Sequence, residues 1–390
     1  MIDLERVRAE TPGCLDRVFL DSAGSSLPPE PVVQAMVEHL RREAEVGGYL
    51  AEEERAADLA GVRDALGWLL RCTPECIALV DSATRAWTQF FYAVPLEPGD
   101  RILLSRAEYA SNAVAALQRA RVHGAQVDVI PADASGELDV EALERMLDER
   151  VRLVSLVHVP TNGGLVNPVR EATELVHRVG GLVLLDACQS AGQLDLDVQS
   201  LGVDALAATG RKWLRGPRGT GFLYVRRELI RELEPPVLDL HSATWTAANR
   251  YELRDDATRF ELWESDVAAR LGLEAAIDYL LELGVDAVAA AVAARAELLR
   301  ELLDELPGVT VTDLGRRHCG IVSFVVDGVP ATAVRDALAK RRITVTVSSR
   351  SSTLLDMTDR SLEAVVRASP HYFVSEEQLE QTAAAVSELI

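Results

Sequence analysis

The sequence predicts an α/β protein with a large domain built on a mostly parallel seven-stranded sheet and a smaller α+β domain at its C-terminal end. Between about residues 30 and 290, amphipathic stretches rich in Ala, Leu and Arg alternate with short Val, Ile and Leu runs. Continuous apolar runs are typical of parallel strands that helices cover on both faces. A length of 390 residues is more than one hydrophobic core usually organises, so we expect two domains.

Seven apolar runs are the predicted strands of the large domain, since each is bounded by Gly, Pro, Asp or Asn. In chain order they are Ile77 to Val80, Arg101 to Leu104, Gln126 to Ile130, Leu153 to His158, Leu182 to Asp186, Ala205 to Thr209 and Gly221 to Val225. The amphipathic stretches between these runs are the predicted covering helices.

After about residue 260 the pattern changes to that of a separate unit. A long helix, Asp266 to Leu283, leads into a second helical stretch, Asp286 to Leu306. The later elements are Val309 to Thr312, Gly320 to Val326, a helix near Ala331 to Arg341, Ile343 to Val347, Ala364 to Ser369 and a terminal helix from Ser375. We therefore expect an N-terminal arm (residues 1–20) packing with the small domain, a large domain (21–260), and a linking helix with the small domain (261–390).

Charge and cysteine content narrow the class of partner. The chain has 61 acidic and 40 basic side chains, and this net charge of -21 repels nucleic acids and anionic membranes, so a small-molecule partner is expected. The first residues, MIDLERVRAE, lack the apolar stretch of a signal peptide, and no segment reaches the length of a membrane span, so we expect a cytoplasmic protein. An odd number of cysteines, five, argues against a disulfide framework. Cys72 and Cys76 form the closest pair but no zinc set, so no metal is expected.

Polar residues follow the predicted strands, where ligands of open α/β sheets bind. These segments are Asp81 to Thr84, Ser105 to Asn112, Thr161 to Asn162, Asp186 to Gln189 and Thr209 to Lys212. Because parallel strands end at one edge of a sheet, we expect these loops to form one site.

Lys212 and Asp186 are the strongest candidates for chemistry at this site. Lys212 is the only lysine before residue 340 in a chain whose basic residues are mostly Arg, which favours a role as an amine nucleophile over a simple positive charge. Asp186 ends an apolar strand, and a carboxylate buried there needs a partner such as a protonated pyridine nitrogen. Taken alone, each residue also fits an ordinary role, a surface lysine for Lys212 and a salt bridge or helix cap for Asp186.

Seven stretches in order along the chain carry a family resemblance. They are FLDSAGSSLPP, DSATRAW, HVPTNGGLVNPV, LLDACQSAGQ, TGRK, RFELWES and VRASPHYF. The chain resembles the class V aminotransferases, the cysteine desulfurase-like branch of fold type I pyridoxal phosphate (PLP) enzymes, over nearly all its length. The resemblance implies the fold type I PLP-dependent transferase fold, PLP as cofactor and a homodimer with its active site near the subunit interface.

The resemblance assigns roles residue by residue. Lys212 would bind PLP as a Schiff base, Asp186 would pair with the ring nitrogen, and Tyr109 would stack over the ring. The other implied cofactor contacts are Asn162 and Gln189 beside the ring hydroxyl, and Ser82, Ala83, Thr84, Thr209 and Arg211 around the phosphate. A small-residue turn that opens a helix suits a phosphate, because it offers free N–H groups and a positive dipole end. Arg367 would bind the carboxylate of an amino acid substrate through two parallel hydrogen bonds. Further substrate contacts are expected from Ser25, Tyr49 and Glu264.

Two departures from the family narrow the expected activity. Cysteine desulfurases need a catalytic cysteine on a loop of the second domain, but the segment TVSSRSSTLLDM, Thr346 to Met357, contains none. The stretch RFELWESD carries Trp263 and Glu264 where the family usually has a small residue and a threonine that reaches the neighbouring subunit's phosphate. A carboxylate is repelled by a phosphate dianion, which puts that contact in doubt.

The chain is most similar to the isopenicillin N epimerase-like subgroup, which includes the carbon-sulfur lyase of ergothioneine biosynthesis and relatives that tailor sulfur-containing lincosamide antibiotics. We therefore expect β-elimination from an S-substituted cysteine or its sulfoxide, with Lys212 removing the α-proton. The alternatives are decarboxylation coupled to oxidative deamination, epimerisation, transamination, or a PLP-fold binding subunit without catalysis.

Overall fold

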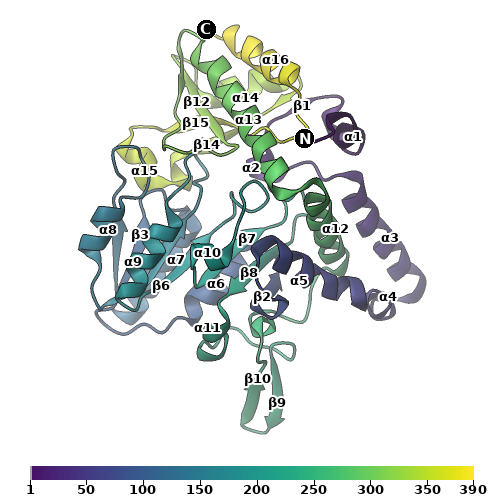
Figure 1. Ribbon diagram of the computed structural model, residues 1–390, viewed down its shortest axis with the longest axis vertical. Helices are drawn as coiled ribbons and strands as arrows, with labels where there is room; N and C mark the ends of the chain where they lie inside the picture. The colour runs from purple at the N-terminus through teal and green to yellow at the C-terminus, as the bar shows by residue number, and fades with distance from the viewer. Residues whose placement is uncertain (1) are drawn as a thin grey trace.

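The computed structural model describes residues 2–390 and is built around a seven-stranded sheet with the order β2-β8-β7-β6-β5-β3-β4 (Figure 1). The strands are β2 Ile77–Val80, β3 Arg101–Ser105, β4 Gln126–Ile130, β5 Val151–Val157, β6 Leu182–Asp186, β7 Ala205–Thr209 and β8 Gly221–Val225. β8 is antiparallel to both β2 and β7, while the other neighbouring strands are parallel. The predicted α/β fold with a mostly parallel sheet is therefore confirmed.

Two of the strands predicted for the seven-stranded sheet differ from the observed ones at their ends. β3 includes Ser105, one residue beyond the prediction, and β5 runs over Val151–Val157 instead of Leu153 to His158. β5 begins early because Val151 still pairs with Arg101 of β3 across a register shift. His158 lies outside the strand, although its backbone N–H donates to the carbonyl of Asp186.

Helices pack around this sheet (Figure 1). α6 Ala83–Ala93 contacts β7 and β8, and α9 Val169–Arg178 contacts β5 and β6. α12 Val267–Leu283 packs against α3 Glu30–Val46 and α5 Ala56–Leu70. The other helices before α12 are α1 Leu4–Ala9, α2 Ser22–Ser25, α4 Gly48–Glu54, α7 Ala110–His123, α8 Val140–Met146, α10 Val198–Leu201 and α11 Arg227–Glu232. Short 3₁₀ turns cover Pro12–Cys14, Pro74–Cys76, Ala257–Phe260 and Arg350–Ser352.

A second, antiparallel sheet forms in the C-terminal part, with the order β11-β12-β15-β14. Its strands are β11 Val309–Val311, β12 Val322–Val326, β14 Thr346–Ser349 and β15 Ala364–Ala368. The accompanying helices are α13 Val285–Asp304, α14 Ala331–Lys340, α15 Leu354–Asp359 and α16 Glu376–Ser387. α16 begins with a capping box, in which Ser375 and Gln378 satisfy each other's backbone N–H groups.

The expected strand Ile343 to Val347 is two strands in the structure. β13 Ile343–Thr344 pairs in parallel with β1 Val18–Phe19, and β14 then pairs with β15. The chain changes partner at Val345, which explains the break. The pairing with β1 joins the first residues of the chain to the C-terminal part, and Arg8 adds hydrogen bonds to Phe373 O and Gln378 Oε1.

The sequence did not predict the hairpin of β9 Ala243–Ala247 and β10 Arg250–Leu253, which projects from the body of the protein (Figure 1). Most of its side chains are exposed, so it lacks the apolar alternation that marks a half-buried strand. Within residues 2–390, no helix is both long and apolar enough to cross a membrane.

Candidate active site

A cavity of about 240 Å³ lies at the carboxyl ends of the central strands. The predicted cofactor contacts that line it are Ser82, Ala83, Thr84, Tyr109, Asp186, Gln189, Thr209, Arg211 and Lys212. Asp81, Val157, Val159, Thr161, Cys188, Arg218 and Gly219 line the same cavity. The loops that the sequence placed at one edge of the sheet therefore do meet, because their strands are neighbours in the sheet.

The Ser82 turn has the geometry of a phosphate cradle. Ser82 is the N-cap of α6, and its side chain accepts a hydrogen bond from the backbone N–H of Arg85. The first N–H groups of a helix have no partner within the helix and carry the positive end of its dipole. Gly221 of β8 lies against this turn so closely that a Cβ there would stand 2.5 Å from the carbonyl carbon of Ser82. The turn and Gly221 together fit a bound phosphate group.

Lys212 lies on the turn between β7 and β8 and is half-buried at the cavity. Burial lowers the pKa of its amine, because the charged form loses hydration. Arg215, three residues after Lys212, adopts a positive φ of 61°. Its side chain donates hydrogen bonds to Leu27 O, Tyr372 Oη and Thr11 Oγ1. The backbone of the lysine turn is thus fixed by contacts with the N-terminal and C-terminal segments.

Asp186 ends β6 and is buried at the wall of the cavity. Its Oδ1 accepts from the backbone N–H of Cys188 at 3.0 Å, and its Oδ2 accepts from Asn112 Nδ2 at 3.0 Å. Two donated hydrogen bonds stabilise the ionised carboxylate. A buried carboxylate, a half-buried lysine and a helix N-terminus lie around one cavity. PLP requires these groups for its ring nitrogen, aldehyde and phosphate, so these residues fit the cofactor.

The remaining predicted cofactor residues support the cavity in different ways. Gln189 Nε2 donates to Ala23 O at 3.0 Å, and Thr209 Oγ1 donates to Thr220 O at 3.0 Å. Arg211 donates to the carbonyl of Gly24 and leaves part of its guanidinium facing the cavity. Tyr109 is 40% exposed and lines the cavity, so its ring is accessible to a bound cofactor.

Arg367 lies on β15 and connects the second sheet to the cavity. Its Nη1 donates to Thr161 O at 3.0 Å and to Thr161 Oγ1 at 2.8 Å, and its Nη2 pairs with Asp21 Oδ1 at 3.2 Å. Nε is buried and has no hydrogen-bond partner among residues 2–390. Burial lowers the pKa of this guanidinium. Thr161 lines the cavity, so Arg367 reaches its edge.

Besides Arg367, four predicted residues do not line this cavity in the single chain. Asn162 turns away, because its Nδ2 donates to the buried carboxylate of Asp356 at 2.7 Å. Ser25 ends α2 without lining the cavity. Tyr49 on α4 is 76% exposed and packs near Trp263, with 6.0 Å between ring centroids. Glu264 lines a second cavity of about 240 Å³, which shares Asp81 and Gly219 with the first. The roles of these four residues, like those of the other predicted site residues, stay predictions.

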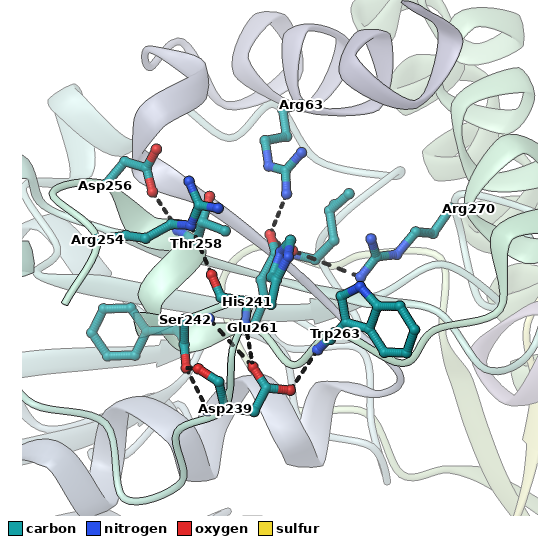
Figure 2. A network of polar contacts seen from close by, with 12 residues as sticks. Arg63, Asp239, His241, Ser242, Arg254, Asp256, Thr258, Glu261, Trp263 and Arg270 are labelled. Atoms are coloured by element: carbon teal, nitrogen blue, oxygen red, sulfur yellow. Dashed lines mark hydrogen bonds and ion pairs between the residues drawn. The ribbon is translucent and has the colours of Figure 1, made fainter. Parts of the chain in front are cut away.

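Glu261 is the buried centre of an ion cluster with Arg63, His241 and Arg270 (Figure 2). This cluster fixes the segment that carries Trp263 and Glu264. Glu261 accepts from Arg63 Nη2 at 2.6 Å and from the backbone N–H of Leu79, and it pairs with His241 at 3.1 Å. Burial opposes ionisation of Glu261, but the hydrogen bond with His241 and the charges of Arg63 and Arg270 outweigh it, so its pKa is lowered. The segment is thereby tied to β2, beside the Ser82 turn.

Arg218 is a cavity residue that the sequence reasoning missed, and Cys188, within the expected Asp186 to Gln189 segment, was given no role of its own. Cys188 stands two positions after Asp186 within LLDACQSAGQ, so its place next to a candidate catalytic residue was a signal. Burial raises the pKa of its thiol strongly, which disfavours the reactive thiolate. Arg218 lies on the loop after Lys212, where no strand pattern marks its direction.

Comparison with known proteins identifies the family. The aminotransferase class-V model matches residues 18–382. A probable cysteine desulfurase of Halobacterium salinarum is 31% identical over 99% of this chain and 96% of its own length. The apo structure of the cysteine desulfurase from Thermococcus onnurineus NA1 superposes with a TM-score of 0.93 at 26% identity, covering 100% of this chain and 98% of that one.

The cystine C-S lyase C-DES is similar to this chain in two solved structures, each with a TM-score of 0.88 and 27% identity. One is a lysine-to-alanine variant with glycine covalently linked to the PLP cofactor, and it covers 98% of this chain and 99% of its own. The other is a complex with the reaction product cysteine persulfide and covers 97% and 99%. With a family model that matches nearly the whole chain and a cavity whose residues fit the cofactor, this protein belongs to the class V aminotransferase family of PLP-dependent enzymes.

Proposed function

We propose that the protein is a carbon-sulfur β-lyase that acts on an S-substituted cysteine or its sulfoxide. The products are a thiol, or a sulfenate from the sulfoxide, together with pyruvate and ammonia. The observation that carries this proposal is the combination of Lys212 and Asp186 in one cavity with a Thr346 to Met357 segment that holds no cysteine. Relatives named cysteine desulfurase and cystine C-S lyase place cysteine-derived substrates in the same family.

Lys212 is the proposed base for the α-proton of the substrate. Burial lowers the pKa of its amine, which favours the neutral form that can accept a proton. Bound PLP would supply an electron-withdrawing ring that stabilises negative charge at the α-carbon, and Asp186 would pair with its ring nitrogen and preserve that property. Loss of the α-proton and departure of the β-sulfur with its electron pair leave 2-aminoacrylate, an unsaturated amino acid that water converts to pyruvate and ammonia, while the departing sulfur takes up a proton to give the thiol.

Arg367 is the proposed ligand of the substrate carboxylate. Its guanidinium is held in place by Thr161 and Asp21, while Nε stays free of protein partners within the described chain. A planar guanidinium that is already oriented loses little side-chain entropy when it binds a carboxylate. Asp21 neutralises its charge before substrate arrives, which reduces the cost of burying Arg367.

Sulfur transfer to a protein cysteine is disfavoured by the cysteines present. Cys188 is the cysteine in the cavity wall, and its raised thiol pKa keeps it protonated. Cys319 is buried away from that wall, with a pKa raised to about 11. A thiol attacks sulfur as the thiolate, so neither residue suits a persulfide carrier.

We further propose a cytoplasmic homodimer in secondary metabolism, of the type that makes ergothioneine or sulfur-containing antibiotics. Tyr49, Trp263 and Glu264 lie together near the second cavity, which borders the first through Asp81 and Gly219. In a dimer these residues are suited to contact a substrate that is bound where the two cavities adjoin. The Glu264 carboxylate would then select a substrate with a cationic or hydrogen-bond-donating side chain.

The direct test is a product assay with the PLP-loaded enzyme. We would supply S-methylcysteine, its sulfoxide, cystine and free cysteine, and measure pyruvate, thiol, carbon dioxide and alanine in parallel. The proposal predicts pyruvate from at least one S-substituted substrate in equal amount to ammonia, and none from a Lys212→Ala variant. A different result would be alanine and transferred sulfur from free cysteine, with no pyruvate from any conjugate. That result contradicts a β-lyase and supports a desulfurase. Carbon dioxide release or retention of the amino nitrogen in the product points instead to the decarboxylating, epimerising or transaminating alternatives.

A further inference from the structure

The side chain of Asn112 lies between two buried carboxyl groups. Its Nδ2 donates to Glu108 Oε1 at 2.9 Å and to Asp186 Oδ2 at 3.0 Å. All three side chains are buried, and Glu108 is only 4% exposed. An amide NH₂ group has two hydrogens to donate, and here each goes to a different acid. Asn112 therefore links Glu108 to the carboxylate at the cavity wall.

One carboxyl oxygen of Glu108 accepts hydrogen bonds, and the other has no donor within the described chain. Oε1 also accepts from the backbone N–H of Tyr109 at 2.9 Å. Oε2 is buried and has no hydrogen-bond partner among residues 2–390. An ionised carboxylate that is buried without a donor to one oxygen raises the free energy of the folded state. A protonated carboxyl group in the same place raises it much less.

Within residues 2–390, the groups that shift the pKa of Glu108 include no cation. Asn112 faces it from α7, Ser155 from β5 and Asp186 from β6. Asp186 is the charged group among these neighbours, and its charge is negative. Two acids that share one amide cannot both ionise at low cost in a buried place. Asp186 also accepts from the N–H of Cys188 and borders the amine of Lys212, whereas Glu108 keeps one oxygen without a partner among residues 2–390.

We propose that Glu108 is a positioning residue for Asp186: it carries a proton, orients Asn112, and leaves Asp186 as the single fixed negative charge beside the cofactor ring. The pKa of Glu108 supports this assignment, since burial first and the charge of Asp186 next raise it to about 8, against the hydrogen bond from Asn112. Loss of the proton in mildly alkaline solution would add a second negative charge behind Asp186. The inference rests on the PLP site of the proposed function but is independent of the substrate.

The test uses the spectrum of the PLP-loaded enzyme without substrate. We would record visible absorbance and circular dichroism from about pH 6 to about pH 10 for the wild type and for Glu108→Gln, which keeps the shape and the oxygen acceptor but cannot ionise. The wild type is expected to show a transition near pH 8 that Glu108→Gln lacks. A transition of equal size and midpoint in both proteins overturns the proposal.

Cofactor retention gives a second measurement that does not depend on activity. Glu108→Ala and Asn112→Ala should each raise the dissociation constant of PLP by about tenfold, because the orientation of Asp186 is lost, while Glu108→Gln stays within about twofold. The matched control is Asp204→Asn, which removes a buried carboxylate bonded to His177 and the N–H of Val183 at the other end of the sheet. This control should lower thermal stability and leave both the spectral transition and PLP affinity unchanged. Equal loss of PLP in Asp204→Asn and Asn112→Ala contradicts a specific role.

Discussion

Trp213 Nε1 donates a hydrogen bond of 3.0 Å to Gln189 Oε1, and this contact joins the turn that carries Lys212 to the turn that follows Asp186. Both side chains are buried. The indole ring also lies beside His371, whose Nε2 is 3.0 Å from Trp213 O. The amine and the carboxylate of the candidate site are thus held at a fixed separation by a contact between their own loops.

Replacement of Trp213 by Phe should loosen this link. Trp213→Phe leaves the buried Gln189 Oε1 without a donor, so the free energy of unfolding should fall by about 1–3 kcal/mol. Chemical denaturation of the PLP-free protein measures this change. Trp245→Phe is the control, because Trp245 is 78% exposed on the hairpin and its loss should have little effect. Equal stability of both variants would show that the contact between loops contributes nothing.

Substitution of Gly221 tests the phosphate cradle. In Gly221→Ala the new Cβ would stand 2.5 Å from Ser82 C and 2.8 Å from Ala83 N, so the turn must move. We expect PLP to bind at least about tenfold more weakly, since a displaced turn misplaces several N–H donors. Equilibrium dialysis measures the dissociation constant. Gly48→Ala is the control, as its Cβ would meet nothing within 4 Å. Unchanged affinity in Gly221→Ala means that the phosphate lies elsewhere.

Arg367→Lys should weaken substrate binding strongly, although the variant keeps the positive charge. A lysine ammonium cannot make two parallel hydrogen bonds to a carboxylate, so KM should rise by about tenfold or more with a smaller change in kcat. Steady-state kinetics with the best substrate separates the two constants. Arg300→Lys provides a matched buried arginine on α13, paired with Asp313 at 2.8 Å, and should alter stability but not KM. If both variants have the wild-type KM, Arg367 does not bind substrate.

Stability should fall in mildly acidic solution because of His158. Burial first, and then the charge of Arg317, lower its pKa to about 4. The unfolded chain therefore takes up a proton near the ordinary histidine pKa while the folded chain does not, so stability is lost as pH falls from about 6.5 toward 4. Between pH 7 and 5 this amounts to about 2 kcal/mol for His158. Urea unfolding of His158→Gln at both pH values should show a loss smaller by that amount. A loss equal to that of the wild type would mean that His158 accepts a proton in the folded state.

The sheet and the centre of the site could be predicted because both depend on local sequence. Each central strand is a buried apolar run, and the residues after parallel strands must meet at one edge. That rule brings Asp186 and Lys212 into one cavity without knowledge of the loops. The hairpin β9–β10 was missed for the opposite reason, since exposed strands leave no apolar pattern.

Contacts between segments far apart in the sequence could not be predicted from it. Asn162 and Asp356 are 194 positions apart, and only the folded structure shows that they bond. The same holds for Arg215, whose partners Thr11 and Tyr372 lie in opposite ends of the chain. The bridge from Glu108 through Asn112 to Asp186 needs the packing of α7 against the central strands. Such contacts fix side-chain direction, which patterns of hydrophobicity do not encode.

The most direct measurement is the site of covalent attachment of PLP. Borohydride reduction of the PLP-loaded enzyme, followed by digestion and mass analysis of the peptides, should place the pyridoxyl group on Lys212 alone. The Lys212→Ala variant should carry no label, although its cavity keeps the other residues that line it. A label on Lys340, the one lysine outside the cavity, or no label on the wild type contradicts the account of this active site.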